Sequence, residues 1–281
     1  MGYSMHMTTG GTSWLRVYCN RSTIGYWSIH LAALVGVLVT GASWRGLGLA
    51  VLLYIPRMFF VTAAYHRYFS HRSFKTSRWF QFVLALGATL TGQKGPLWWA
   101  SNHRAHHKHS DSPSDVHSAA QGGFWWAHHG WITAGRDVTD YAQIKDFAKY
   151  PELRFINKHD WIAPWTLGVI SYLIAGWSGL VVGFFGSTIL LWHGTFCINS
   201  LAHVFGRRRY DTPDTSRNSF LLALFTGGEG WHNNHHHYQA SARQGFYWWE
   251  IDPVFMGLRV LSWFGIVRDL KTPPRQIRDA R

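Results

Sequence analysis

The sequence predicts an all-α integral membrane protein, with four spanning helices in two hairpins and a helical cap on the cytoplasmic side. Three observations lead to this fold class. Apolar runs long enough to cross a bilayer come in two closely spaced pairs. Histidines gather in the polar segments that follow the apolar runs. Hydrophobic residues make up 47% of the chain, yet its mean hydropathy is only −0.10, as expected if half of it lies outside the lipid.

The first apolar pair covers Gly25 to Thr40 and Gly46 to Tyr65. Each run has the length of a spanning helix, and the short glycine-containing turn between them predicts a hairpin. Arg57 follows Pro56 inside the second run, nine residues before His66 and thus about 13 Å into the membrane. A lipid-facing guanidinium at that depth is costly, so we expect it to face protein or a polar cavity. A structural ion pair and a functional role both remain open for it.

The next apolar run, Trp79 to Trp99, permits two interpretations. If it crossed the bilayer, His66 and His71 would lie on the opposite side from His103, and they could not share a site. Five residues also interrupt its apolar character, namely Thr89, Thr91, Gln93, Lys94 and Pro96. We therefore expect a helix that lies in the membrane interface or dips into it.

The second hairpin is expected at Trp161 to Trp177 and Leu180 to Ile198, around a Ser178-Gly179 turn. Two crossings return the chain to the side it left, so every histidine-rich segment lies on one face of the membrane. The predicted division is an N-terminal cytoplasmic segment at 1–24, a first hairpin at 25–65, a cap with the interfacial helix at 66–160, a second hairpin at 161–200, and a cap with a C-terminal interfacial helix at 201–281.

Charge indicates which face this is. Of 27 Lys and Arg, Arg45 falls in the outer turn and Arg57 within a span, which leaves 25 on the histidine side. The positive-inside rule then places the cap and both termini in the cytoplasm. The net charge of +13 is spread through all polar segments without a nucleic-acid-binding signature, so nucleic acid is excluded. Anionic lipid or an acidic electron-donor protein is the expected partner. With only Cys19 and Cys197, no disulfide framework is expected.

The histidines show a repeated spacing. On a helix, His103, His106 and His107 fall on one face, because positions i, i+3 and i+4 are neighbours there. The same spacing recurs at His232, His235 and His236. With His66, His71 and His203, the candidate ligands are nine: His66, His71, His103, His106, His107, His203, His232, His235 and His236. Two solvated His-rich turns are the alternative, which the recurrence disfavours.

Nine imidazoles suit two metal ions that each keep a position open, because a first-row metal takes four to six ligands. Neutral imidazoles also hold redox iron without placing many carboxylates close to lipid. His66 and His71 lie about 140° apart on an ideal α-helix, so their segment must bend for both to bind. Asn199 shares a helical face with His203 and would hold a metal-bound water there; it could equally be an ordinary polar helix end.

Four ordered motifs carry a resemblance to a known family. They are His-Arg-Tyr-Phe-Ser-His at 66–71, His-Arg-Ala-His-His at 103–107, Asn-Ser-Leu-Ala-His at 199–203 and Gly-Glu-Gly-Trp-His-Asn-Asn-His-His at 228–236. From about Tyr54 to Trp249 the chain resembles membrane fatty acyl desaturases of the stearoyl-CoA desaturase type. This resemblance implies two iron ions (Fe2+ or Fe3+) bound by the nine histidines, with Asn199 reaching one through water. It also implies that O2 and two electrons insert a cis double bond into a saturated acyl chain.

The resemblance also implies a substrate tunnel. Gln93, Trp99 and Thr195 match residues that enclose the bend of the acyl tunnel, which favours a Δ9-like position for the new bond. Phe196 stands where those enzymes have a tunnel-side Trp, and Ser101-Asn102 replaces a charged pair that binds the CoA headgroup. Acyl-CoA, acyl-lipid and acyl-carrier-protein substrates therefore all remain open. Without a His-Pro-Gly-Gly haem-domain signature, electrons should come from a separate ferredoxin-like or cytochrome-like protein.

The remaining histidines receive supporting roles. Residues in the cap are expected to support the site rather than to bind metal, namely His109, His117, His128 and His129. His193 lies in a span, where it would line the tunnel or bond a neighbouring helix, and His237 should point away from His236. Two other functions are conceivable: a fatty acyl hydroxylase or other di-iron oxygenase with the same cage, and a membrane metal transporter, which should carry ligands inside its spans.

Overall fold

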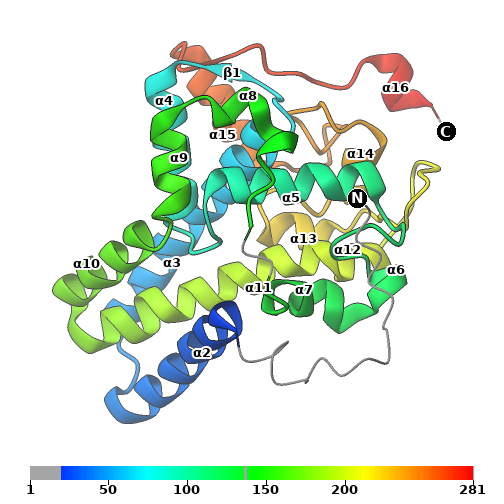
Figure 1. Cartoon of the computed structure of the whole chain (residues 1–281). Coiled ribbons are helices and arrows are strands. Elements are labelled where there is room, and N and C mark those ends of the chain that lie inside the picture. Colours follow the sequence, from blue (N-terminus) through cyan, green and yellow to red (C-terminus); the bar gives the residue numbers. More distant parts are fainter. Residues whose placement is uncertain (1–19, 136–137, 281) are drawn as a thin grey trace.

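A computed structural model describes residues 20–135 and 138–280, and most of these residues are helical (Figure 1). From its start to residue 158, the described chain forms the helices α2 (Arg21–Thr40), α3 (Trp44–Phe60), η1 (Val61–Ser70), α4 (Arg78–Thr89), α5 (Pro96–His109), α6 (Ala119–Gly122), η2 (Trp126–Gly130), α7 (Trp131–Thr133), η3 (Tyr141–Ile144), α8 (Lys145–Ala148) and α9 (Pro151–Lys158).

The second half continues with α10 (Ile162–Ser178), η4 (Gly179–Gly186), α11 (Ser187–Asn199), α12 (Leu201–Val204), α13 (Phe220–Phe225), α14 (His232–His237), α15 (Pro253–Trp263) and α16 (Arg275–Asp279). A two-stranded antiparallel sheet joins β1 (Lys75–Thr76) to β2 (Val267–Arg268), with Lys75 opposite Arg268. This small sheet ties the C-terminal segment to the chain that follows η1.

Three helical stretches among the described residues are long and apolar enough to cross a membrane: Ser22–Thr40, Trp44–Ser70 and Ile162–Val204. The third is 43 residues long and contains a break, because Ala175 and Gly176 have non-helical backbone angles. Gly176 has a φ of 59°, which glycine adopts without the steric cost other residues meet. The expected turn of the second hairpin therefore lies slightly before Ser178-Gly179.

The segments on either side of this break pack against each other. A Cβ on Gly179 would meet the carbonyl oxygen of Ser171, and one on Gly168 would lie 3.0 Å from Phe184. Such contacts require α10 to run back along η4. Figure 1 shows α2, α3, α10 and α11 grouped at one end of the molecule, with the short helices at the other.

The single interfacial helix predicted from Trp79 to Trp99 is longer than the helix that the structure has there. Helix α4 ends at Thr89, and the last residues of the predicted segment belong to α5, which begins at Pro96. Thr91 bonds back to the carbonyl of Ala88, and Lys94 has a φ of 69°. These turn conformations stop the helix between Thr89 and Pro96, so the tight turn positions α5 beside η1.

Arg57 packs inside the protein, as its depth required. Its guanidinium is 3% exposed and donates hydrogen bonds to the Leu53 carbonyl, the Thr188 hydroxyl and the Ser187 hydroxyl. These partners are neutral, so the ion pair that the sequence left open is not found among the described residues. Arg57 instead joins α3 to the start of α11.

Candidate metal centre

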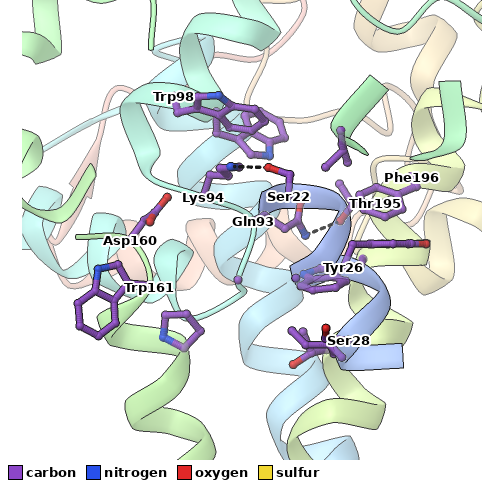
Figure 2. Close-up of a pocket in the computed structure, with 18 of the residues that line it drawn as sticks. Ser22, Tyr26, Ser28, Gln93, Lys94, Trp98, Asp160, Trp161, Thr195 and Phe196 are labelled. Atoms are coloured by element: carbon purple, nitrogen blue, oxygen red, sulfur yellow. Dashed lines mark hydrogen bonds between the residues drawn. The ribbon is translucent and has the colours of Figure 1, made fainter. Parts of the chain in front are cut away.

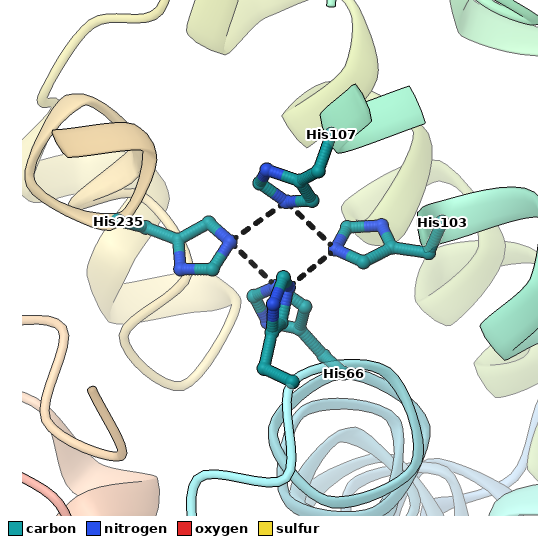
Figure 3. A group of neighbouring side chains, drawn as sticks. His66, His103, His107 and His235 are labelled. Atoms are coloured by element: carbon teal, nitrogen blue, oxygen red, sulfur yellow. Dashed lines mark hydrogen bonds between the residues drawn. The ribbon is translucent and has the colours of Figure 1, made fainter. Parts of the chain in front are cut away.

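Five imidazoles converge in the cap. His66, His71, His103, His107 and His235 each offer a ring nitrogen, and these nitrogens lie within 4.8 Å of one another. Their Nε2 atoms are 2.9 Å apart for His71 and His103, 3.0 Å for His103 and His107, 2.9 Å for His107 and His235, and 3.0 Å for His66 and His235. Figure 3 shows the rings pointing toward one shared centre.

The backbone explains how His66 and His71 join this group. Their segment, η1, is a π-helix, in which hydrogen bonds link positions five apart. The His71 amide accordingly bonds the His66 carbonyl at 3.2 Å. Residues five apart lie on one face of such a helix, so the bend expected for this segment takes the form of a wider turn.

Four further imidazoles form a second group. His106, His203, His232 and His236 are all buried, and their candidate ligand nitrogens also lie within 4.8 Å of one another. The Nε2 atoms of His203 and His232 are 3.1 Å apart. The nine predicted histidines are thus divided five to four, with α5 contributing to both groups.

Both groups have the chemistry of metal sites. Burial lowers the pKa of His71, His103 and His107 well below 6.5, so these rings are neutral and each has a lone pair. Nε2 of His106 and of His236 is buried without a hydrogen-bond partner. Adjacent ligand positions around an ion, with bonds of roughly 2.1 Å at right angles, lie roughly 3.0 Å apart. The measured 2.9–3.1 Å separations therefore fit a bound metal.

Carboxylates orient the rings from behind. Nδ1 of His106 donates to Asp115 at 2.9 Å, and Nδ1 of His236 donates to Asp214 at 2.7 Å. Nδ1 of His66 contacts the Glu229 carboxylate. Each contact keeps a proton on Nδ1 and directs the Nε2 lone pair into its group. Nδ1 of His203 bonds Thr215 in the same way, at 3.0 Å.

The ionised state of these carboxylates follows from their hydrogen bonds. Burial alone would raise the pKa of Asp214, but hydrogen bonds from His236 and Ser216 outweigh it and hold the pKa well below 3.8. The pKa of Asp115 is lowered in the same way: burial would raise it, but the hydrogen bond from His106 outweighs this effect. Sequence reasoning missed both residues. The sequence offers a signal only for Asp115, which follows the histidine motif at 103–107 closely, in a chain that has just 14 acidic residues.

Arg67 was also missed, although it is the largest fully buried side chain among the described residues. It donates to Glu229 at 3.1 Å and to Asp252 at 3.0 Å, and to the Ala242 carbonyl at 2.8 Å. This buried ion pair joins η1 to the loops around α14. It holds Glu229 where that carboxylate meets His66.

A mostly apolar cavity of about 480 Å³ adjoins the five-histidine group. The four predicted tunnel residues, Gln93, Trp99, Thr195 and Phe196, all line it, as do Asn199 and His103. Gln93 donates to the Thr195 hydroxyl at 3.0 Å (Figure 2). The Trp99 ring stacks on His103, with centroids 4.8 Å apart. The water-mediated role of Asn199 stays a prediction.

The pair before the second histidine motif is turned inward. The Ser101 hydroxyl and the Asn102 amide both donate to the Trp98 carbonyl at 2.9 Å. Ser101 is buried, and Asn102 lines the cavity. Neither residue contributes a charge that would bind an anionic headgroup.

The other histidines lie outside both groups. The His117 ring lies against that of His106, with centroids 4.2 Å apart and the planes tilted by 30°. His237 donates to the Ile277 carbonyl, away from His236 as expected. His193 does bond a neighbouring helix: its Nε2 lies 3.1 Å from Nε2 of His30 on α2, and its Nδ1 lies 2.8 Å from Nε2 of His128. His109 and His129 belong to neither group.

Comparison with known proteins adds independent findings. The sequence model of a family described as "Fatty acid desaturase" matches residues 42–261. The chain is 38% identical to the sn-1 stearoyl-lipid 9-desaturase of Anabaena variabilis, covering 89% of this chain and 93% of that protein. It is 39% identical to the Synechocystis sn-1 stearoyl-lipid 9-desaturase, over 88% of this chain and 78% of that one. An acyl-CoA 5-desaturase of Anemone leveillei is 32% identical, over 93% and 83%.

Proposed function

The chain belongs to the fatty acid desaturase family, and from this premise we propose that its two histidine groups bind a pair of iron ions and that it introduces a cis Δ9 double bond. It is a membrane fatty acyl desaturase, an oxidoreductase of lipid metabolism. The observation that carries the iron proposal is the convergence of nine imidazoles in two groups beside a mostly apolar cavity. The names of the relatives support the Δ9 position.

The residues would divide the work as follows. His66, His71, His103, His107 and His235 would hold one ion, and the other four histidines the second, with Asn199 joining through water. When bound, the iron pair would supply the redox chemistry. In the overall reaction, one hydrogen is removed from each of two adjacent carbons, and these two hydrogens, two electrons and two protons reduce O2 to two waters. The electrons would come from a separate ferredoxin-like or cytochrome-like donor.

The cavity residues would determine which carbons react. The hydrogen bond between Gln93 and Thr195 fixes two polar side chains in an otherwise apolar wall. Trp99 connects that wall to the centre through its stacking on His103. An acyl chain in this cavity would be held in one orientation and shielded from water, which is the protein's part in such chemistry.

We also propose the membrane arrangement. The hairpins at 25–65 and 161–200 would each cross twice, because the break at Ala175 and Gly176 divides the third apolar stretch into two. The segments 1–24, 66–160 and 201–281 would then lie in the cytoplasm with the metal centre and both termini. The excess of Lys and Arg in these segments, 25 of 27 in the chain, supports this orientation.

Expression in cells that lack endogenous desaturases tests the function. Gas chromatography of the fatty acids should show new cis-Δ9 monoenes. His103→Ala removes an imidazole from the five-histidine group and should abolish them. His109→Ala, on the same helix but in neither group, is the matched control and should keep activity. Hydroxy-acyl products without monoenes would establish hydroxylation instead, and full activity of His103→Ala would remove His103 from the ligand set.

A further inference from the structure

The cavity beside the metal centre opens sideways, between α2 and the start of α10. Six residues of helix α2 line it, and four of them are small, namely Ser22, Gly25, Ser28 and Ala32. Three of these, Gly25, Ser28 and Ala32, are also exposed. A Cβ added to Gly25 would meet nothing within 4 Å. Residues that both line a cavity and are exposed mark its mouth.

The opposite edge of this mouth is aromatic. Trp161 and Trp165, at the start of α10, line the same cavity, yet they are 59% and 51% exposed. Figure 2 shows Trp161 and Ser28 on either side of the opening. Exposed tryptophans near the end of a spanning segment are typical of the membrane interface. We call this opening, bounded by Gly25, Ser28, Ala32, Trp161 and Trp165, the lateral slot.

Helix α2 is firmly held on its other side. The Thr23 hydroxyl donates to the Thr133 carbonyl at 2.7 Å, and the His30 ring meets His193 at 3.1 Å. These residues lie roughly 150° around the helix from Gly25 and Ala32, since successive residues are about 100° apart. The small side chains of α2 therefore line the slot on the side of the helix away from these two contacts.

Polarity changes along the slot. At its upper end Lys94 donates to the Ser22 hydroxyl at 3.1 Å, and Asp160 lines the cavity nearby (Figure 2). Ser22 is also the first residue of the apolar stretch Ser22–Thr40. From Ser22 to Ala32 the helix descends about 15 Å beside apolar walls. A polar end at the interface above an apolar channel matches a membrane lipid, whose headgroup stays at the surface while its acyl chain lies in the hydrocarbon region.

We propose that the lateral slot admits the acyl chain of a membrane lipid, still ester-linked to its headgroup, directly from the bilayer to the metal centre. This inference rests on the proposed desaturase function and names its substrate carrier. The headgroup would stay beside Ser22, Lys94 and Asp160. The inward-turned Ser101 and Asn102, which offer no charge to a CoA phosphate, agree with this carrier.

Photolabelling in liposomes tests the slot without depending on turnover. The probe is a phosphatidylcholine with a diazirine in the middle of one acyl chain, and the readout is labelling of the peptide that contains Trp192 and Thr195, which line the cavity. Gly25→Leu should fill the slot and lower that labelling at least tenfold. Gly48→Leu is the matched control, because Gly48 also lies on a spanning helix with nothing within 4 Å, but it does not line the cavity. Equal labelling of the two variants would contradict the proposal that the acyl chain enters through the lateral slot.

Turnover then identifies the carrier. Wild-type protein in liposomes, with reductant, is given an 18-carbon chain on phosphatidylcholine, on CoA or on acyl carrier protein. We expect the lipid-linked chain to react at least tenfold faster, and Gly25→Leu to slow it at least tenfold with unchanged metal content. Faster reaction of either soluble carrier would overturn the lipid assignment. No monoene from any carrier would contradict the desaturase function, whereas the labelling result would still decide the slot.

Discussion

At the scale of single residues, the carboxylates behind the histidines deserve as much weight as the histidines. Asp214 accepts a hydrogen bond from Nδ1 of His236, and the buried Nε2 of that ring has no hydrogen-bond partner, so its lone pair is available to a metal. Asn in place of Asp214 has nearly the same shape, but it carries no charge and its amide could offer a hydrogen to the ring. Asp214→Asn should therefore weaken metal binding roughly 10- to 100-fold.

Chelator competition measures that loss. Asp211→Asn is the control, since Asp211 is fully exposed three residues away and pairs only loosely with Arg208, at 3.7 Å. The pH dependence follows from the lowered pKa of Asp214. A carboxylate with a depressed pKa stabilises the fold above its unfolded value of 3.8 and loses this contribution as the pH falls through the folded value. The Tm difference between wild type and Asp214→Asn should stay constant from about pH 8 to pH 5.

The hydrogen bond between Gln93 and Thr195 offers a second prediction. Thr195→Val keeps the shape of the side chain but removes the acceptor of a bond that Gln93, 9% exposed, donates at 3.0 Å. Leaving a buried amide unpaired costs about 1–3 kcal/mol, so the cavity wall should rearrange. We expect lower activity and a spread of double-bond positions, read by mass spectrometry of dimethyl disulfide adducts. Thr166→Val, at an exposed position of α10, should leave the position of the double bond unchanged.

The sequence could predict six of the nine histidines from helical spacing, because His103, His106 and His107 fall on one face of a helix, as do His232, His235 and His236. The motifs at 66–71 and 199–203 indicated the other three. The sequence did not indicate the carboxylates in the same way. It could not predict Asp111, Asp115 or Asp214. These residues lie in loops, and loop positions depend on contacts far along the chain. Asp111, for example, accepts a hydrogen bond from the hydroxyl of Thr215, 104 positions away. No local pattern reports such a pairing.

At the scale of elements, two features show how far local reasoning extends. The bend between His66 and His71 was foreseen from the angle between them, but its form, a π-helix, was not. The helix expected at 79–99 was divided by a turn at Gly92 and Lys94, whose φ values of 70° and 69° end any α-helix. The apolar run at 79–99 indicates that its residues are buried or lie in lipid, but the turn after Thr89 determines where the helix ends.

Arg57 provides the prediction at this scale. Its planar guanidinium reaches one carbonyl and two hydroxyls at once, which an ammonium group cannot match. Arg57→Lys should lose at least one of these charged hydrogen bonds and about 1.5–3 kcal/mol, and should lower the apparent Tm of the solubilised protein by roughly 4 °C or more. Arg57→Met avoids burying a charge and should be less harmful than Lys. Arg45→Met, at an exposed position in the first turn of α3, is the control. A milder effect of Lys than of Met at position 57 would contradict this account.

Across the chain as a whole, the number of membrane crossings determines whether the histidine segments can meet, because only an even number between two segments leaves both on the same face. In the proposed arrangement, an interfacial α4 and two hairpins would bring four distant segments to one membrane face. The structure does bring the histidines of these segments together. The proposal that the cap lies on the cytoplasmic side rests on charge alone. Single cysteines, introduced in a background where Cys19 and Cys197 are replaced by Ser, test it. Ala42→Cys should react with a membrane-impermeant maleimide in intact cells. Asp211→Cys should react only after permeabilisation, and the reverse pattern would refute the orientation.

The two histidine groups also impose an order on biosynthesis. Each group takes residues from α14, which begins at His232 of 281 residues, so neither is complete until most of the chain has left the ribosome. The hairpin at 161–200 precedes α14 and would already be inserted by then. If the two groups bind iron as proposed, iron loading would be a late step of maturation, and in iron-starved cells the waiting protein would be a membrane-inserted chain with an unfinished cap, exposed to quality-control proteases.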